Sequence, residues 1–574
     1  MEHKHLENLS STAPMLPKKE NGEEKMVILT PHSNGVGKIL IREDTILANI
    51  QGCACGRARF TCSGVKKQWS VLCWGRQSDK KYYTLLVCLS ATFVLSLIGT
   101  IFFCFTNTIN DAILSNMVIR NNSLAYSVWK KPNVQPLMKV HIFNYTNWER
   151  FRDGLDEKLH VQDVGPYVYS QQLERVNVEF DEDRITFQER NDFRFLANKS
   201  AGAQFDQVTV PNMPLLGLAK VLETSSVISL LQLPIVGSVS YANHPHAFVQ
   251  LPVHRFLWGY EDTIFNVAKP LLSLRGELKV NQFGLLAVKN DTLSERLTIN
   301  TGEVDMDKMN VIEKLEGEDN LNLWGSSDCN SIEATDGSIF PPSQLDRKTV
   351  LHVFYPNLCR RLPFHYEKDI EVDGIPLLRY KLPSNVFDDP AHNPENQCYC
   401  EIDTGVCPPR GVINVTACTM GAPALASFPH FYMGDPRLFK KISGLRYDPL
   451  MHENYLDVHP TLGIALSGKS SLQINMQVRK TKTFSALGFL DQGMILPIAW
   501  IEMAVEELPE SLRTLIYHGT FSTAAVQLGL AVTSITSLLI SGVCLFILLI
   551  GRRQKPCATV KIPIETELKN QQLL

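Results

Sequence analysis

The sequence predicts a mixed β protein with helices, in which a large ectodomain built on an antiparallel sheet or barrel is anchored by two terminal transmembrane helices. Three observations lead to this fold class: two long uncharged apolar runs, a block of cysteines between them, and short segments of alternating polar and apolar residues. The chain has 574 residues, a net charge of -3 and 44% hydrophobic residues. This composition is ordinary for a globular protein and gives no indication of nucleic-acid binding.

The two apolar runs cover residues 82–105 and 523–550, and neither contains a charged residue. A helix of about 24 residues, at about 1.5 Å per residue, is long enough to cross a hydrocarbon core of about 30 Å. Lysine and arginine cluster before the first run and after the second. The positive-inside rule therefore places both tails in the cytosol. The first run begins too far into the chain to be a cleavable signal peptide.

This topology divides the chain into five parts. They are a mostly disordered cytosolic tail (1–81), a transmembrane helix (82–105), an extracellular or luminal ectodomain (106–522), a second transmembrane helix (523–550) and a cytosolic C-terminal tail (551–574). A third apolar stretch, residues 213–239, contains Lys220, Glu223 and two prolines. Because its uninterrupted apolar part is too short to span a membrane, we expect helices of the ectodomain there.

Six of the fourteen cysteines lie close together in the ectodomain: Cys329, Cys359, Cys398, Cys400, Cys407 and Cys418. Such density indicates a disulfide framework in an oxidising compartment. A metal site is the alternative, but it would require Cys-x-x-Cys pairs and nearby histidines at fixed spacing, and this block has neither pattern.

Glycosylation sequons support the same sidedness. Asn-x-Ser/Thr triplets begin at five ectodomain positions: Asn121, Asn144, Asn198, Asn290 and Asn414. Asn8 also begins such a triplet, but it lies in the cytosolic tail and is expected to stay unmodified.

Local patterns predict the elements of the ectodomain. Alternating segments indicate strands over residues 139–145, 167–172, 184–188, 377–382 and 471–478. Helices are expected over residues 215–231 and 253–265. Antiparallel strands decorated with helices follow from this mixture.

Small residues recur every four positions in the second apolar run, at Ala525, Gly529, Thr533, Ser537 and Ser541. Small side chains on one helix face favour close packing, either against the first span or against another copy of the protein in a homo-oligomer. A pore lining is the functional alternative.

Cysteines also occur in both cytosolic tails. Cys53, Cys55, Cys62 and Cys73 lie among basic residues of the N-terminal tail, and Cys557 follows the second span. The sequence leaves three readings open: palmitoylation, in particular of Cys73 and Cys557, a small zinc site in the N-terminal tail, or free thiols.

Several separate motifs together resemble the class B scavenger receptor family. In chain order they are Gly165-Pro166-Tyr167-Val168-Tyr169, Leu257-Trp258-Gly259-Tyr260, Asp336-Gly337-Ser338-Ile339-Phe340-Pro341-Pro342, Cys398-Tyr399-Cys400, Pro429-His430-Phe431, Tyr455-Leu456-Asp457-Val458-His459-Pro460 and Pro497-Ile498-Ala499-Trp500. The resemblance runs from about residue 90 to 550, and it rests on the order of these motifs together with the terminal spans and the six cysteines.

The resemblance implies more than the residue patterns do. The ectodomain would be one antiparallel β-barrel with an apolar tunnel that holds fatty acids, sterols or their esters, and with a helical apex at about residues 213–253. The implied disulfides are Cys329–Cys398, Cys359–Cys418 and Cys400–Cys407.

The apex of this sequence departs from that of family members that present lysines there. Residues 233–252 contain no lysine or arginine, and Lys220 and Arg255 are the basic residues nearby. Strong affinity for anionic particles is therefore not expected at this position. His244 and His246 stand there instead. They are candidates for a charge switch at endosomal pH, and the alternative is that they are ordinary loop histidines.

The leading functional hypothesis is a scavenger or lipid-uptake receptor in the plasma membrane or the endolysosomal membrane. Its partners would be lipids or lipoprotein-like particles, with no cofactor and no catalytic residues. A lysosomal membrane receptor for a luminal or extracellular protein is the second hypothesis, and a two-span ligand-gated channel is the third. An enzyme is disfavoured because common hydrolase, zinc-protease and dinucleotide motifs are missing from the sequence.

Overall fold

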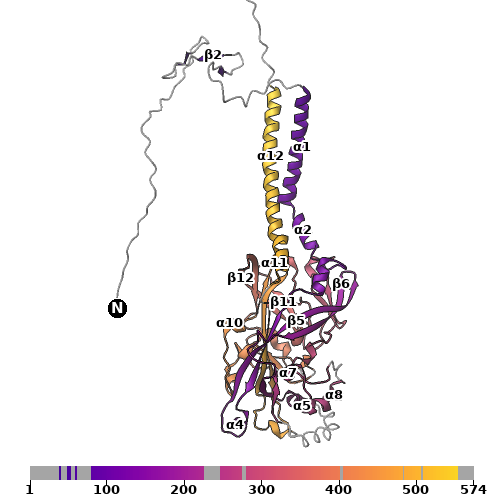
Figure 1. Cartoon of the computed structure of the whole chain (residues 1–574), viewed down its shortest axis with the longest axis vertical. Helices are drawn as coiled ribbons and strands as arrows, with labels where there is room; N and C mark the ends of the chain where they lie inside the picture. The colour runs from indigo at the N-terminus through magenta and orange to yellow at the C-terminus, as the bar shows by residue number, and fades with distance from the viewer. Residues whose placement is uncertain are drawn as a thin grey trace, which may run out of the picture. The chain divides into compact units, whose positions relative to one another are not determined.

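The computed structural model describes residues 38–39, 48–52, 58–60, 79–224, 246–273, 280–400, 405–419, 421–481, 484–505 and 508–553. The chain separates into two units, Met1–Cys88 and Leu89–Leu574. In the first unit, β1 (Lys38–Ile39), β2 (Ala48–Gly52) and β3 (Ala58–Phe60) form a small antiparallel sheet. The second unit holds the large sheet, its surrounding helices and α12 (Figure 1).

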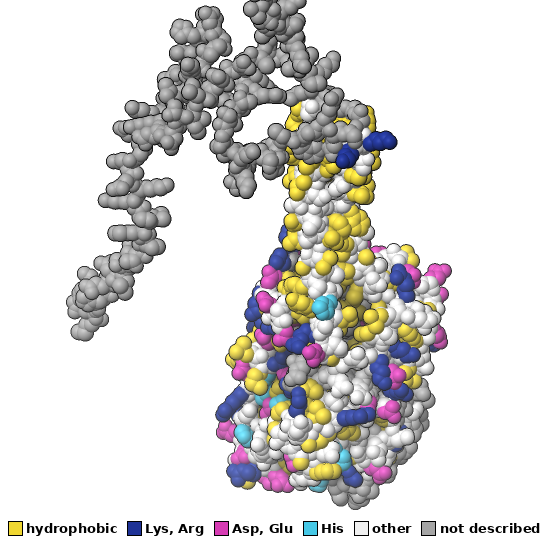
Figure 2. Space-filling view, turned by 45° about the horizontal axis from the view of Figure 1, so that its top comes forward, with side chains coloured by type: hydrophobic (Ala, Val, Ile, Leu, Met, Phe, Trp, Pro, Cys, Tyr) yellow, Lys and Arg dark blue, Asp and Glu magenta, His cyan; other side chains and the backbone are white. Residues whose placement is uncertain are grey.

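Both apolar runs form long helices, α1 (Asp79–Phe105) and α12 (Thr523–Arg553). Within the described ranges, these are the two helices long and apolar enough to cross a membrane, α12 together with α11 (Glu510–Tyr517) and the π-helical turn η10 (His518–Ser522) that precede it. Little of their apolar surface is buried by the rest of the chain, and Figure 2 shows hydrophobic side chains along them. The expected sites of both spans thus coincide with exposed apolar helices.

Small and hydroxyl side chains line the contact between α1 and α12. The Ser96 hydroxyl donates to the Ser537 hydroxyl at 2.8 Å, and the Thr100 hydroxyl donates to that of Ser534 at 3.4 Å. A Cβ atom added to Gly99 would lie 3.3 Å from Ser534, so the backbone of α1 approaches closely here. The two helices therefore pack as small-residue membrane helices do.

The predicted stripe of five small residues is only partly at this contact. Ser537 and Ser541 lie in the interface, whereas Ala525, Gly529 and Thr533 are exposed on α12. The reason is geometric: at about 100° per residue, each step of four residues turns about 40° around the helix axis, so a long stripe leaves the contact face. A homo-oligomer through the exposed part of the stripe stays a prediction.

The large sheet is antiparallel in every strand pair except the short pairing of β16 with β5. Its main path runs β10-β9-β6-β5-β4-β19-β18-β17-β13-β12-β11. In chain order its strands are β4 (Leu137–Tyr145), β5 (Leu159–Asp181), β6 (Arg184–Phe195), β9 (Leu297–Asn300), β10 (Ile312–Leu315), β11 (Leu351–Tyr355), β12 (Arg360–Val372), β13 (Ile375–Lys381), β14 (Val412–Asn414), β15 (Ala424–Ser427), β16 (Ile442–Ser443), β17 (Tyr455–Val458), β18 (Ala465–Gln477) and β19 (Ile495–Ala504). Strands therefore occur at all five positions where alternation predicted them.

The core gathers on β4 and β19, which pair in the middle of this sheet. Val140 and Ile142 of β4, and Leu496, Ile498 and Ala499 of β19, are completely buried. Cross-strand neighbours share a face of a sheet, so the register also brings polar side chains of the two strands together.

The two ends of the main path lie close to one short segment of the chain. Ile312 of β10 donates its N–H to the carbonyl of Ala334 at 2.8 Å. Next to it, the Thr335 N–H donates to the carbonyl of His352 at 3.1 Å, and the Phe354 N–H of β11 donates to the carbonyl of Thr335 at 2.9 Å. Residues 334–335 thus hydrogen-bond to both edge strands of the path.

Short helices surround the sheet. They are α2 (Thr108–Ser115), α3 (Leu124–Lys130), α4 (Trp148–Arg152), α5 (Met213–Thr224), α7 (Val253–Trp258), α8 (Thr263–Ser273), α9 (Ser327–Asn330) and α10 (Pro449–His452). A separate hairpin of β7 (Gln207–Pro211) and β8 (Phe248–Pro252) lies between the helices α4 and α7 in the chain.

Two helix predictions need adjustment. The helix expected over residues 215–231 is observed as α5 up to Thr224, and the remainder lies outside the described residues. The helical stretch expected over residues 253–265 is observed as α7 and the start of α8, which a break at Gly259 separates. Gly259 has a φ of 150°, and a Cβ there would come within 3.0 Å of the Gln282 side chain. Glycine is needed at this break.

Candidate functional site

A groove with a volume of about 610 Å³ lies beside the hairpin of β12 and β13. Apolar and charged residues line it: Leu345, Asp346, Arg347, Lys348, Asp369, Pro376, Leu377, Leu378 and Pro460. Its volume falls within the range of about 300–1,000 Å³ that is common for small-molecule sites. An apolar floor with a charged rim suits an amphipathic ligand.

The rim is electrostatically balanced. Arg347 donates to both carboxylate oxygens of Asp369, at 2.6 and 3.3 Å, and the pair is more than half exposed. The hydroxyl of Tyr380 donates to the carbonyl of Asp346 at 2.8 Å and fixes the loop that carries Arg347. Because the charges of Arg347 and Asp369 neutralise each other, a ligand would be held mainly by the apolar floor of the groove.

The groove adjoins the part of the ectodomain from which α12 leaves. Leu377 lines the groove and also packs in an apolar cluster with Ile516 of α11, which leads into α12. Arg513 of α11 lies 3.5 Å from Asp373 at the tip of the β12–β13 hairpin. The groove therefore lies on the side of the ectodomain nearest the apolar helices.

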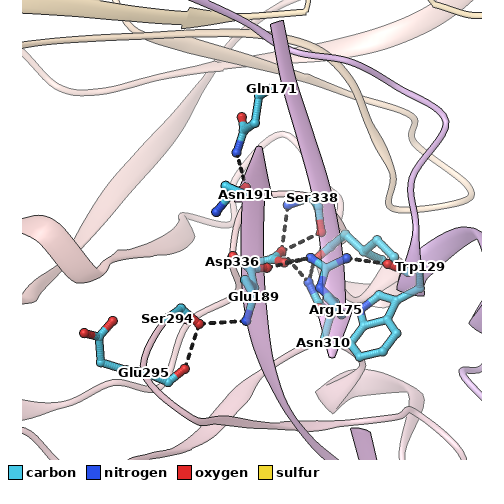
Figure 3. Close-up of polar contacts among 11 residues, drawn as sticks. Trp129, Gln171, Arg175, Glu189, Asn191, Ser294, Glu295, Asn310, Asp336 and Ser338 are labelled. Carbon is cyan, nitrogen blue, oxygen red and sulfur yellow. Dashed lines mark hydrogen bonds and ion pairs between the residues drawn. The ribbon is translucent and has the colours of Figure 1, made fainter. Parts of the chain in front are cut away.

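A buried ion cluster stabilises the neighbouring strands β5 and β6 (Figure 3). Arg175 is 4% exposed; its guanidinium lies 3.0 Å from Asp336 and 3.2 Å from Glu189, and it donates to the carbonyl of Trp129 at 2.6 Å. The same guanidinium lies over the Trp129 ring, 4.8 Å from its centroid. Asp336 also accepts from the Asn310 amide at 2.8 Å. One cation thus joins α3, two strands and the loop at Asp336.

Two carboxylates around one cation leave an excess of negative charge. Burial raises the pKa of Glu189, because the charged form loses water, although the nearby Arg175 opposes this. Ser338 donates to Asp336 through its hydroxyl at 2.6 Å and its N–H at 2.9 Å. The cluster contains no group placed for chemistry on a ligand, and its role is structural.

A second polar cluster lies where β4, β5 and β19 meet. The Asp163 carboxylate accepts from His141 at 3.0 Å, from His430 at 2.9 Å and from the Trp500 indole at 3.0 Å. Burial alone would raise the pKa of Asp163, but these hydrogen bonds outweigh it and hold the pKa well below its usual range. The His430 Nδ1 atom accepts the Arg446 N–H at 3.1 Å, so His430 carries its proton on the nitrogen that faces Asp163.

Two further histidines are held neutral. Burial, with repulsion from His430, lowers the pKa of His452 to about 4, and its Nδ1 atom accepts the Asp448 N–H at 3.1 Å. Burial likewise lowers the pKa of His459 to about 4, and its Nδ1 atom accepts the N–H groups of Thr461 and Leu462, both at 3.2 Å. Protonation of either ring would cost these backbone hydrogen bonds.

The melting temperature of the full-length protein in detergent is expected to fall as the pH is lowered from 6.5 to 4. The unfolded chain takes up protons at its ordinary histidine pKa of about 6.5, whereas folded His452 and His459 do so only near 4, so their stability contribution is complete above 6.5 and lost through this window. The lowered pKa of Asp163 acts at still lower pH. Burial raises the pKa values of Glu189 and Asp262, so the titration of these two groups stabilises the folded protein as the pH falls.

A His459→Asn variant provides the control for this pH dependence. The asparagine oxygen can accept the same backbone N–H groups but does not titrate, so its melting curve should depend less on pH than that of the wild type. An equal pH dependence in the two proteins would contradict the role given to His459.

The six cysteines of the ectodomain block form the pairs that the resemblance implied: Cys329–Cys398, Cys359–Cys418 and Cys400–Cys407. Trp324 and Tyr399 pack among the first two bridges, and the Trp324 indole donates to the carbonyl of Cys359 at 2.7 Å. Arg360 lies over the Tyr399 ring, 3.9 Å from its centroid. The block thus forms a small core of its own beside β12.

Of the three predicted apex residues, the structure describes Lys220 and His246. Lys220 of α5 is 6% exposed, so its side chain does not face an approaching particle. His246 is exposed, 6.3 Å from the ring of Trp148, whereas His244 lies outside the described residues. A contact of these residues with a ligand, and the charge switch, stay predictions.

The sequons differ in exposure. Asn121 and Asn198 are exposed, whereas Asn144, Asn290 and Asn414 are half-buried and each accepts a backbone N–H through its side-chain oxygen. The tail cysteines Cys53, Cys55, Cys62, Cys73 and Cys557, and the sequon at Asn8, lie outside the residues whose placement or side chains are described.

Glycopeptide mapping of the protein from mammalian cells should find glycans at Asn121 and Asn198 and none at Asn8. Exposed sequons outside the cytosol are accessible to the transferase, whereas a cytosolic sequon never meets it. A glycan at Asn8, or unmodified Asn121 and Asn198 in a protein that reaches its membrane, would contradict the proposed sidedness. Replacing each asparagine with glutamine gives the matched control for the mass shift.

Sequence reasoning missed the residues at the centres of the two polar clusters. Arg175 and Asp163 stand alone among strand residues and give no local signal. Asp336 and His430 were marked only as parts of motifs, in Asp336-Gly337-Ser338 and Pro429-His430-Phe431. These motifs were the sequence feature from which polar contacts of the two loops could have been predicted.

Known proteins match most of this chain. The model of the CD36 family matches residues 88–550. The chain is 31% identical to "Scavenger receptor class B member 1" of Rattus norvegicus over 397 residues, 69% of this chain and 75% of that protein. It is 30% identical to "Lysosome membrane protein 2" of Mus musculus over 442 residues, 75% of this chain and 88% of that protein. The human "Lysosome membrane protein 2" matches to a similar extent, with 30% identity over 442 residues.

Proposed function

Because this chain belongs to the CD36 family, whose members are receptors and not enzymes, we propose that it is a two-span lipid-uptake receptor with a β-barrel ectodomain. In this proposal both tails are cytosolic, and the ectodomain receives lipid or a lipid-bearing particle. Apolar cargo then passes through the barrel to the membrane. The driving force is the removal of apolar surface from water, about 25 cal/mol per Å², so no covalent step is needed.

Barrel closure is supported by the backbone contacts of residues 334–335. Because these two residues hydrogen-bond to both β10 and β11, they can complete the ring that the main path of the sheet leaves open. Ala334 and Ile312 also pack in one apolar cluster with Phe354. The chain would then enclose an interior without a free sheet edge.

The observation that best supports lipid delivery is the groove beside β12 and β13. Its apolar floor shares Leu377 with the cluster that contains Ile516, immediately before α12. A lipid in this groove would lie next to the membrane end of the ectodomain with its polar group toward the Arg347 rim. We place the delivery end of the path here.

The test is lipid uptake by cells that express the full-length protein, together with mass spectrometry of lipids that co-purify with it. Pro376 is exposed in the groove, so Pro376→Trp should fill the groove and reduce uptake at unchanged surface expression. Lys368→Trp places the same ring on an exposed position of β12 outside the groove lining and should leave uptake unchanged. Absence of bound lipid and of uptake by the wild type would refute the proposal.

A lysosomal role is the second candidate, and two observations favour it. "Lysosome membrane protein 2" of Mus musculus matches more of this chain than the rat scavenger receptor does, 75% against 69%. In addition, His452 and His459 stay neutral until the pH approaches about 4, which keeps their backbone hydrogen bonds at moderately acidic pH. Imaging a tagged full-length copy distinguishes a lysosomal from a cell-surface location, and a protein ligand would be sought only in the lysosomal case.

A further inference from the structure

The turn around α10 displays large apolar side chains to solvent. Leu450 is 79% exposed, Tyr447 is 58% exposed and Met451 is 52% exposed. Single exposed apolar residues are common on soluble proteins, but three within five positions of one turn form a local apolar surface. This surface has no cover among the described residues.

The turn holds these side chains outward rigidly. Pro449 begins α10, and the Asp448 carboxylate accepts the N–H groups of Leu450 and Met451, at 2.9 and 3.4 Å. At the other end His452 is buried, and its ring stacks on His430 with 5.0 Å between centroids. Because the helix is capped at one end and anchored at the other, its apolar tip needs little ordering when a partner binds.

Basic residues flank this tip, and none of them makes an ion pair within the described residues. These residues are Lys440, Lys441 and Arg446, and all are exposed. The carboxylates of the same stretch are engaged: Asp435 with Arg437, Asp448 with the α10 backbone, and Glu453 with Lys381. Three unpaired cations therefore accompany three exposed apolar side chains.

Contacts with residues 430–432 hold the segments that carry these groups near one another. The Arg446 N–H donates to His430, and the Tyr447 ring lies 5.7 Å from that of Tyr432. Phe439, directly before Lys440, packs its ring against Phe431 at 6.1 Å. Lys440, Lys441, Arg446, Tyr447, Leu450 and Met451 are here called the α10 patch.

We propose that the α10 patch docks onto the anionic phospholipid surface of a lipid-bearing particle or vesicle. Apolar side chains that project between basic ones suit a charged lipid interface, where the cations meet headgroup phosphates and the apolar tips enter the acyl boundary. A protein partner would have to supply a matching pocket for each exposed apolar side chain, whereas a lipid surface accepts them without one. Lipid therefore fits this surface better than an acidic protein does.

The surface that the patch meets belongs to a separate particle. Figure 1 shows α10 on the flank of the ectodomain, well away from α12, so the bilayer that holds α12 is out of its reach. The inference rests on the proposed uptake of lipid and adds a contact site outside the apex, at residues for which sequence reasoning had no role.

The experiment measures binding of the full-length protein, held in phosphatidylcholine nanodiscs, to vesicles of phosphatidylcholine with or without phosphatidylserine. The wild type should prefer the anionic vesicles and lose this preference as salt is raised. Leu450→Ser with Met451→Ser, and separately Lys440→Glu with Lys441→Glu and Arg446→Glu, should each weaken binding by about tenfold or more, a change of about 1.4 kcal/mol. All substituted side chains are exposed, so melting temperatures should stay unchanged.

Matched controls come from another exposed site. Val304 is 81% exposed and follows Glu303, and Lys308 is exposed nearby, so Val304→Ser and Lys308→Glu should leave vesicle binding unchanged. Equal binding of wild type and α10-patch variants to anionic vesicles would overturn the inference. So would a wild type that ignores phosphatidylserine but binds soluble polyglutamate through the same residues, because the partner would then be acidic protein.

Uptake of free fatty acid separates this inference from the proposed function. The α10-patch variants should take up free fatty acid as the wild type does, because that cargo needs no particle. Vesicle binding that depends on the patch in a protein without any lipid uptake would support the patch and refute the proposed function. Normal lipid uptake together with vesicle binding that does not depend on the patch would refute this inference and support the proposed function.

Discussion

Replacing Arg175 with methionine is expected to destabilise the ectodomain by about 3 kcal/mol. Removing one partner of a buried ion pair typically costs about 3–5 kcal/mol, because the other charge is left without compensation. The lower end applies here, since the carboxylates of Asp336 and Glu189 keep contact with water, with 23% and 25% of their side chains exposed. Methionine fills much of the same volume and keeps contact with the Trp129 ring.

The pH dependence of this loss identifies its electrostatic origin. In the variant, the Glu189 carboxylate lacks the cation that holds its pKa down, so its pKa rises further and it becomes neutral as the pH is lowered. The difference in melting temperature between variant and wild type should therefore shrink toward acidic pH. Arg347→Met removes an exposed ion pair and should change the melting temperature little. A small, pH-independent effect of Arg175→Met would show that packing, not charge, holds this cluster.

Alternation along the chain was sufficient to find strands with one exposed face. β4 and β13 match the predicted segments 139–145 and 377–382 to within a few residues. The sequence patterns did not predict β19, although it lies at the centre of the sheet. Seven of its ten residues are buried, on both faces, so polar residues do not alternate with apolar ones and residues 495–501 read as one apolar run.

The candidate sites were less accessible to sequence reasoning than the fold. The contacts of Asp163 with His141 and His430 join segments that are far apart in the chain. The local sequence around each residue therefore does not predict these contacts. The groove is similar, because Leu345 and Pro376 become neighbours only when the loop at Asp346 packs against β13. The disulfide block could be predicted from the sequence, because a high density of cysteines indicates disulfide bonds without any knowledge of the topology.

Removing the Cys329–Cys398 bridge, with both cysteines changed to serine, is expected to cost about 4 kcal/mol. In the chain-entropy account a bridge stabilises by restricting the unfolded chain, and the effect grows with the logarithm of the loop length. This bridge closes a separation of 69 residues, whereas Cys400–Cys407 closes only 7. The same relation gives about 2 kcal/mol for the shorter loop. The two double variants therefore test the account within one protein.

Packing should add to the difference between these bridges. Cys329 is buried beside Trp324 and Tyr399, so serine at this position also places a hydroxyl in an apolar cluster. Melting temperatures of the full-length protein, and the fraction that leaves the endoplasmic reticulum, should both fall further for Cys329→Ser/Cys398→Ser than for Cys400→Ser/Cys407→Ser. Peptide mapping without reduction verifies the pairs in the wild type. Equal losses in the two variants, or free thiols at these positions, would refute the role of the long loop, and the block would then act through packing alone.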